Sequence, residues 1–486
     1  MKPSGHKSSL PALVALRLDL RADCSALCPE GPVYQEMGRA LVEDLGRLTG
    51  YRPRLCSDDA DPASLGGGPV VVVGNMMVNR AARDLYYAAY DLTDYAWPGA
   101  GGSVVRTVRD PFGTGAHAVV LGGSDEAGVA GAVTRLSGLV EEAGPEIGYV
   151  NEVTLGGHAD AIRAWSEELL GDDNEMWQRV GPWGSWAFMG HIGRAGAGYL
   201  RTGDEAYLSV FLREMRYFLE HDVFNPGESR SMIHSLVDAL LVPWDLMADH
   251  AFFTAEIRRE IDEGLLYLCR SDEGPGPLEG APWVIRDNHG TGRALDAFFE
   301  GRYFWRRYGL EEGKTWMELA ASYFAPQLTS YKPLEDNYGH ELGASLFNTL
   351  QYALASGEAD YVGSEAMQRA AERAIIALPV GGTASGLLSA CAAVTGDASY
   401  LSLEADAGAE AYVKGCAGME GRFILGEYLR TFCGIPVPAE RRELLGVAVA
   451  PLDELWHRTI DRRMNPGDLY VMTVPREAGF DKVSLR

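Results

Sequence analysis

Two short segments of the chain gather polar side chains around glycines. In WVIRDNHGTGRAL, residues 283–295, Asn288 and His289 are adjacent and Arg293 follows the histidine by four residues. Residues four apart share one face of a helix, so this spacing places the imidazole and the guanidinium together. An amide, an imidazole, a guanidinium and the N–H groups of a helix start can together bind a carboxylate.

The second segment, LEDNYGHEL at residues 334–342, supplies a phenol. Tyr338 is followed by a glycine that would leave its ring uncovered, and His340 and Glu341 enter the helix that follows. A phenol whose pKa is lowered by neighbouring cations can accept a proton and later return it. We therefore expect Tyr338 to act as an acid/base beside the carboxylate receptor.

This combination suits removal of the C5 proton of a uronic acid. The resulting carbanion is stabilised when the adjacent carboxylate is neutralised, because its charge can then delocalise into the carboxylate. Asn288 and His289 would neutralise the carboxylate, while Tyr338 would take the proton or protonate the departing C4 oxygen. The expected reaction is β-elimination in an acidic polysaccharide or oligosaccharide, without a cofactor or a metal.

Other side chains are candidates for binding the sugar. Tryptophan rings can stack on pyranose faces, although tryptophan and histidine in helical stretches are more often packed inside. Arginines at 286, 293, 302, 306 and 307 would give an anionic substrate a basic cleft, or the last three can be solvated charges on a helix surface. The expected substrate-binding residues are Trp183, His234, Trp283, Arg286, Arg293, His340 and Glu341.

The composition limits the class of protein. A chain of 486 residues with 47% hydrophobic and 23% charged residues predicts a globular protein of two domains or more. The formal net charge of −25 argues against a nucleic acid or an acidic membrane surface as partner. A homo-oligomer is compatible with the sequence.

Several features of metal-binding, disulfide-linked, membrane-spanning or secreted proteins are not found in the sequence. The seven cysteines are scattered, without a CxxC pair, which argues against a zinc site or a disulfide framework. No run of apolar residues is long enough to cross a membrane. The short apolar run near the amino terminus is broken by charges and does not predict a secretion signal. We therefore expect a cytoplasmic protein, or a secreted or periplasmic one if further residues precede Met1.

Residues 1–155 alternate between strand and helix patterns, which predicts a small α/β domain. Glycines in LGGSDEAG, residues 121–128, lie between a strand and a helix, where a phosphate can bind. Their spacing is not that of a dinucleotide motif, so we expect only a tight turn. The predicted strands are 12–20, 69–74, 103–110 and 116–123, and the predicted helices are 33–48, 79–90 and 125–142.

Residues 156–466 follow a helical period throughout. Apolar stripes with i, i+3, i+4 spacing occur at 207–219, 231–269, 291–308, 315–331, 341–355, 364–378 and 421–432. The similar stretches TGDEAYL, SGEADYV and TGDASYL each join a capping glycine to an acidic helix start, which predicts stacked helix pairs in a solenoid or a closed ring. Residues 467–486 return to strand-like alternation and would begin a β domain.

These features resemble one family of enzymes. The Asn288–His289 pair near a helix start, followed about fifty residues later by Tyr338 in an all-helical region, is similar to the heparinase II/III and alginate lyase group of polysaccharide lyases. HSLVDALLVPWDLM, residues 234–247, resembles a helix of these enzymes in which Trp-Asp follows an apolar run. The resemblance covers roughly residues 158–486.

The resemblance implies an incomplete (α/α) toroid followed by an antiparallel β-sandwich, with FDKVSLR leading into the sandwich. Asn288 and His289 would match the carboxylate-neutralising pair, and Tyr338 would match the catalytic acid/base. A further catalytic histidine of such enzymes often comes from the sandwich, which we expect beyond residue 486. Residues 1–155 are similar to accessory domains that precede glycan-active catalytic domains.

Two other functions fit the same segments. A glycoside hydrolase on a helical toroid would need two carboxylates about 5 to 10 Å apart. Asp287 paired with Glu335, Asp336 or Glu341 would supply them. A carbohydrate-binding protein without activity is the third interpretation. Elimination creates a conjugated double bond that absorbs in the near ultraviolet. An absorbance assay therefore distinguishes a lyase from a hydrolase and from a carbohydrate-binding protein.

Overall fold

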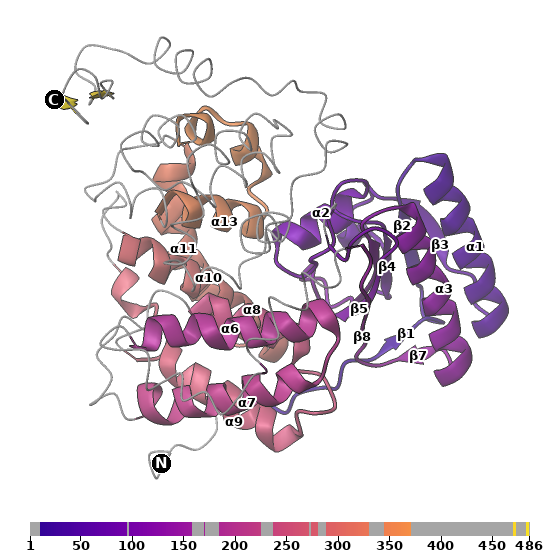
Figure 1. Cartoon of the computed structure of the whole chain (residues 1–486), viewed down its shortest axis with the longest axis horizontal. Helices are drawn as coiled ribbons and strands as arrows, with labels where there is room; N and C mark the ends of the chain where they lie inside the picture. The colour runs from indigo at the N-terminus through magenta and orange to yellow at the C-terminus, as the bar shows by residue number, and fades with distance from the viewer. Residues whose placement is uncertain are drawn as a thin grey trace.

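Short apolar runs in the amino-terminal part of the chain form a six-stranded sheet (Figure 1). The computed structural model describes residues 10–94, 97–157, 170, 184–224, 237–271, 274–279, 288–329, 345–370, 470–472 and 483–485. The strand order is β3 (Arg54–Ser57), β2 (Ser25–Cys28), β4 (Val70–Val73), β6 (Ala118–Gly123), β5 (Ser103–Val108) and β8 (Asn151–Thr154). The first four are parallel, while β5 is antiparallel to both of its neighbours.

The inner strands of the sheet are buried on both faces because their side chains alternate between two apolar cores. In β4, Val71 and Val73 face the core formed with α1 (Pro32–Thr49) and α3 (Glu126–Ala143). Val70 and Val72 belong to the larger core, which includes α2 (Arg80–Tyr87) and the helices beyond residue 184. The α/β part and the helical part therefore share one apolar core.

The structure corrects the predicted strand at 12–20. Only Leu18–Asp19 forms a strand, β1, which pairs with β7 (Glu146–Ile147) away from the main sheet. Val14 is 77% exposed, so this alternating apolar segment is not a strand buried against a core. The Val14 carbonyl oxygen accepts a hydrogen bond from Arg109, which attaches this segment to the end of β5.

The described residues from 184 to 370 form helices joined by short turns. Helix α10 (Asn288–Tyr308) contacts α11 (Glu311–Thr329), α8 (Val237–Met247) and α13 (Leu346–Ser356). The remaining elements of this region are α6 (Gly184–Thr202), α7 (Ala206–Phe218), the π-helix η2 (Leu219–Val223), α9 (Ala255–Cys269), η4 (Gly276–Leu278) and η6 (Ala359–Gly363). None of the helices in the described residues is long and apolar enough to span a membrane.

The predicted helical stretch at 231–269 is two helices in its described part. Helix α8 ends at Met247, and α9 begins at Ala255 after a turn. The side chain of Thr254 accepts a hydrogen bond from the Ile257 amide, which caps α9 and explains the break. The break was not predicted because apolar residues recur at helical spacing on both sides of it.

The repeated turns differ in detail. Gly203 adopts a φ of +72° after α6, the Asp204 carboxylate accepts from the Ala206 amide, and a Cβ at Gly198 would lie 2.8 Å from the Tyr207 ring. This turn confirms the predicted pattern. After α13, however, Glu358 and Asp360 lie at the start of the short helix η6, and Ser364 caps the next helix by accepting from the Met367 amide. The third copy, at 395–401, lies outside the described residues.

Beyond residue 370 the structure describes two short strands. Strand β9 (Tyr470–Met472) pairs antiparallel with β10 (Val483–Leu485). The predicted helix at 421–432 lies outside the described residues. The predicted helix at 364–378 is helical in its described part, to residue 370.

Candidate functional site

The first turn of α10 carries the predicted carboxylate receptor. Asn288 and His289 are half-buried there, and Arg293 is half-buried one turn later. Thr291 is fully buried, and its hydroxyl donates a hydrogen bond of 2.8 Å to the Asn288 carbonyl oxygen. This bond fixes the Asn288 backbone at the start of the helix.

The first turn of α10 contacts the start of α13. The Asn348 side-chain amide donates to the Thr291 hydroxyl oxygen at 3.1 Å, and the Thr291 and Ser345 hydroxyl oxygens are 3.4 Å apart. Ser345 and Asn348 are 1% and 2% exposed, so this contact is made in the interior. Two helix starts that are far apart in sequence are thus joined by a buried polar group.

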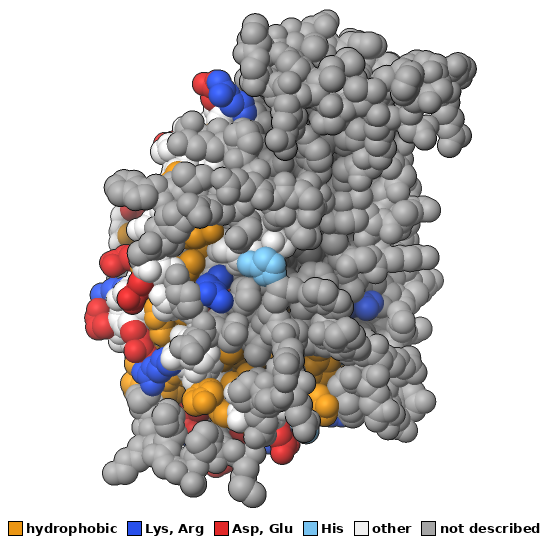
Figure 2. Space-filling view, turned by 90° about the vertical axis from the view of Figure 1, so that its left-hand side faces the viewer, with side chains coloured by type: hydrophobic (Ala, Val, Ile, Leu, Met, Phe, Trp, Pro, Cys, Tyr) orange, Lys and Arg blue, Asp and Glu red, His pale blue; other side chains and the backbone are white. Residues whose placement is uncertain are grey.

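The structure places some of the predicted site residues. Asn288, His289 and Arg293 lie together in the first two turns of α10 and are half-buried. On the face shown in Figure 2, a histidine and a basic side chain reach the surface near the centre, while acidic side chains lie mainly toward the edge. The other predicted residues, Trp183, His234, Trp283, Arg286, Asp287, Glu335, Asp336, Tyr338, His340 and Glu341, lie outside the residues whose side chains are described.

A group of buried carboxyls lies deeper in the helical region. Asp296 and Glu300 are each 3% exposed and lie on the face of α10 that carries His289 and Arg293, since the spacing is four, three and four residues. Asp238 of α8 is fully buried, and its backbone amide donates to Asp296 Oδ1 at 2.8 Å. The Gln351 amide of α13 lies 3.5 Å from Asp238 Oδ2.

These carboxyls hold protons more tightly than usual. Burial, followed by repulsion from Asp238 and Glu300, raises the pKa of Asp296 well above its ordinary value. Burial raises the pKa of Glu300 to about 7, a hydrogen bond from Cys269 opposes this, and Asp238 adds to it. Sequence reasoning missed the group, although acids inside the apolar stripes of two helices were a usable signal.

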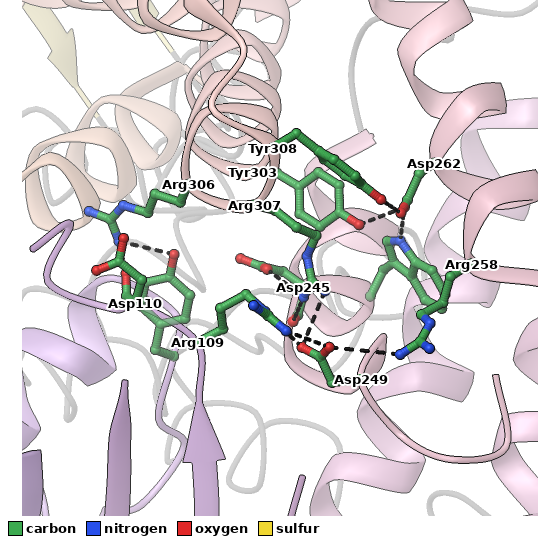
Figure 3. A network of polar contacts seen from close by, with 12 residues as sticks. Arg109, Asp110, Asp245, Asp249, Arg258, Asp262, Tyr303, Arg306, Arg307 and Tyr308 are labelled. Atoms are coloured by element: carbon green, nitrogen blue, oxygen red, sulfur yellow. Dashed lines mark hydrogen bonds and ion pairs between the residues drawn. The ribbon is translucent and has the colours of Figure 1, made fainter. Parts of the chain in front are cut away.

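A second polar network joins the helical region to the α/β part (Figure 3). Arg307 of α10 is buried and pairs with Asp249 at 3.2 Å and with Asp245 at 3.3 Å. Arg109, just after β5, donates two hydrogen bonds to Asp249, at 2.7 and 2.9 Å. Arg258 lies 3.8 Å from the same carboxylate. Asp249 therefore holds cations from both parts of the protein.

The same network contains the Trp-Asp pair of α8. The Trp244 indole donates to Asp262 Oδ1 at 2.8 Å and stacks on Phe211 at a centroid distance of 5.8 Å. The hydroxyls of Tyr303 and Tyr308 also donate to the Asp262 carboxylate. Trp244 is fully buried, so this pair stabilises the helical packing and is not a surface for sugar.

The last three arginines of α10 are neither a substrate cleft nor solvated charges. Arg302 is 3% exposed, stacks 4.3 Å from the Tyr90 ring and donates to the Ala88 carbonyl oxygen. Arg306 donates to the Tyr90 hydroxyl at 3.1 Å and to the Pro111 carbonyl oxygen at 2.6 Å. With Arg307, they attach α10 to the α/β part, so the predicted basic cleft loses three of its five arginines.

The glycine turn at 121–128 has a structural explanation. The Asp125 carboxylate accepts from the Gly128 amide at the start of α3 and from the Gly101 amide, at 2.8 Å each. A Cβ at Gly128 would lie 2.0 Å from the Gly102 carbonyl oxygen. The carboxylate of the chain itself takes the place where an anion would bind, and the glycine permits close backbone packing.

The described histidines outside α10 include two with packing roles. His191 is buried, and burial, with Arg194 and Arg213 nearby, lowers its pKa to about 4. The His250 ring makes edge contacts with Tyr149 and Tyr199, at centroid distances of 5.3 and 5.4 Å. Among the residues that the structure describes, no group of His, Cys, Asp and Glu is arranged to hold a metal ion.

Comparison of the chain with protein-family models, with curated proteins and with solved structures gave no match.

Proposed function

We propose that the chain is a polysaccharide lyase that cleaves a polysaccharide or oligosaccharide of uronic acids by β-elimination. The observation that carries the proposal is the first turn of α10. It presents Asn288 and His289 half-buried, and Thr291 joins it to the start of α13. Tyr338 comes seven positions before Ser345 at that start, which keeps the phenol within a short length of chain.

In the proposed reaction the uronate carboxylate binds at the α10 start. The Asn288 amide and the His289 imidazole donate hydrogen bonds to it, and the positive end of the helix dipole adds to their effect. Tyr338 takes the C5 proton, the C5 electron pair forms the C4–C5 double bond, and the C4–O bond breaks. The departing oxygen receives a proton from Tyr338, which leaves an unsaturated uronide.

The fold that we propose for the lyase is an incomplete (α/α) toroid over residues 156–466, preceded by the α/β accessory domain and followed by a β-sandwich that begins at 467–486. The antiparallel succession of α10 and α11, and the contact of α6 with both α7 and α8, support helix pairs. We further propose a soluble protein that needs no cofactor.

The test is the Tyr338→Phe variant, assayed by near-ultraviolet absorbance on a panel of uronate polysaccharides. Loss of the hydroxyl should abolish turnover while the affinity for substrate changes little, because the phenol acts in the transition state. Tyr323→Phe on α11 is the matched control and should keep wild-type turnover. A Tyr338→Phe enzyme with substantial activity would refute the role of this residue.

Hydrolysis is the second candidate, with Asp287 paired with Glu335, Asp336 or Glu341 as the two carboxylates. Hydrolysis would yield reducing ends without an absorbing double bond, and Asp287→Asn would then abolish it. Binding of the polysaccharide without either product would instead indicate the carbohydrate-binding protein.

A further inference from the structure

We propose that Thr291 and Asn348 are positioning residues, which set the first turn of α10 relative to the start of α13. This inference rests on the proposed function, because it concerns the alignment of the Asn288–His289 pair with the segment before α13. Neither residue is proposed to touch the substrate. They act through the backbone of α10.

The hydrogen bonds of Thr291 form a complete set. A threonine hydroxyl offers one proton and two lone pairs. The hydroxyl donates to the Asn288 carbonyl oxygen at 2.8 Å, with the Ser345 hydroxyl oxygen as an alternative acceptor at 3.4 Å, and a lone pair accepts from the Asn348 amide at 3.1 Å. One side chain thus connects the backbone at Asn288 to two residues of α13.

Burial makes this contact specific. Thr291, Ser345 and Asn348 are between 0% and 2% exposed, so water cannot readily replace a lost partner. A rotation of the α10 start by one residue would leave buried polar groups unpaired, at a cost larger than the net stabilisation of an ordinary hydrogen bond. The contact therefore selects a single register between the two helix starts.

The consequence for the site is geometric. Asn288 is the first residue of α10, and Tyr338 precedes α13 in the sequence. Proton transfer needs the reacting atoms within about 3 to 3.5 Å, and a displacement of about 1 Å can lower the rate on the order of 10²-fold. The buried hydrogen bonds between the starts of α10 and α13 would keep the distance between the reacting groups constant.

The experiment uses the full chain and four variants. Thr291→Val keeps the shape and removes the hydroxyl, while Thr291→Ser keeps the hydroxyl. Asn348→Leu removes the amide. Thr349→Val is the control, because Thr349 is equally buried on α13 but donates to the Ser345 carbonyl oxygen within its own helix. Amide hydrogen exchange at residues 292–295 reports the α10 turn independently of activity.

We expect Thr291→Val and Asn348→Leu to speed exchange at 292–295 by about tenfold. On a uronate polysaccharide they should lower kcat on the order of 10²-fold, with KM changed less than about twofold. Thr291→Ser should restore most of the exchange protection and most of kcat. Thr349→Val should match the wild-type protein in its exchange rate and in its kcat.

The outcomes separate the two proposals. An unchanged rate of amide exchange at 292–295 in Thr291→Val would overturn the positioning inference. A loss of kcat in Thr291→Val that Thr291→Ser does not restore would also overturn it. If the exchange pattern appears as expected but the wild-type protein forms no unsaturated product, the lyase proposal fails and the contact between the helix starts stands.

Discussion

Replacing Glu300 with Gln should remove the part of the stability loss at rising pH that comes from ionisation of Glu300. The Glu300 side chain is 3% exposed and its pKa is raised to about 7 from an ordinary value of 4.5. A carboxyl with a raised pKa stabilises the fold fully below its ordinary pKa, and this contribution is lost as the pH rises through 7. The difference corresponds to about 3 kcal/mol, since one pKa unit equals about 1.4 kcal/mol. Gln cannot ionise, so it escapes this loss.

The assay is urea unfolding of the wild-type and Glu300→Gln proteins from pH 5 to pH 8, followed by circular dichroism. The free energy of unfolding of the variant, relative to wild type, should rise by about 2.5 kcal/mol over this range. Glu318→Gln, at an exposed position of α11, is the control and should show no such trend. A difference between Glu300→Gln and wild type that stays constant with pH would refute the protonated state of Glu300.

Two further predictions concern packing. Asp249→Ala should lower the free energy of unfolding by about 3 to 5 kcal/mol, because Arg307 and Arg109 would lose their shared buried carboxylate; a change as small as that of the exposed Glu311→Gln would contradict this. Gly301→Ala should destabilise the contact of α10 with α11 by about 1 to 3 kcal/mol, because the new Cβ would lie 2.4 Å from the Gly313 carbonyl oxygen. The melting temperature measures it, with Gly363→Ala, which has open space at its Cβ, as the control.

Most element positions could be predicted from periodicity. The helix expected at 33–48 is α1, and the strand expected at 69–74 is β4, whose four valines are buried on both faces. Strands β2 and β3 escaped prediction because SALC and RLCS are short and contain polar residues. Their pairing with β4 and with each other, set by distant residues, makes them strands.

The candidate site could be predicted only in part. The sequence indicated a helix start around Asp287 or Asn288, and the structure has α10 from Asn288. It did not indicate that Thr291, between the two glycines, would bond to α13, because partners 57 residues apart leave no local pattern. The α10 arginines were misjudged for the same reason, since Tyr90 and Asp249, which hold them, lie far away in the sequence.

Two buried acidic sites of the helical region respond to pH in opposite directions, and the difference lies in their neighbours. Burial alone would raise the pKa of Asp249, but Arg307, Arg109 and Arg258 outweigh it and lower the pKa. The stability from these ion pairs is present above the ordinary pKa of an aspartate and is lost as the pH falls through the lowered value. Burial raises the pKa of Glu300 and of Asp296, and the neighbouring Asp238 adds to it, so their contribution to stability is lost as the pH rises. The helical region should therefore be most stable at a pH above the lowered pKa of Asp249 and below the raised pKa values of Glu300 and Asp296. The limits of this range depend on which buried carboxyls have arginine neighbours.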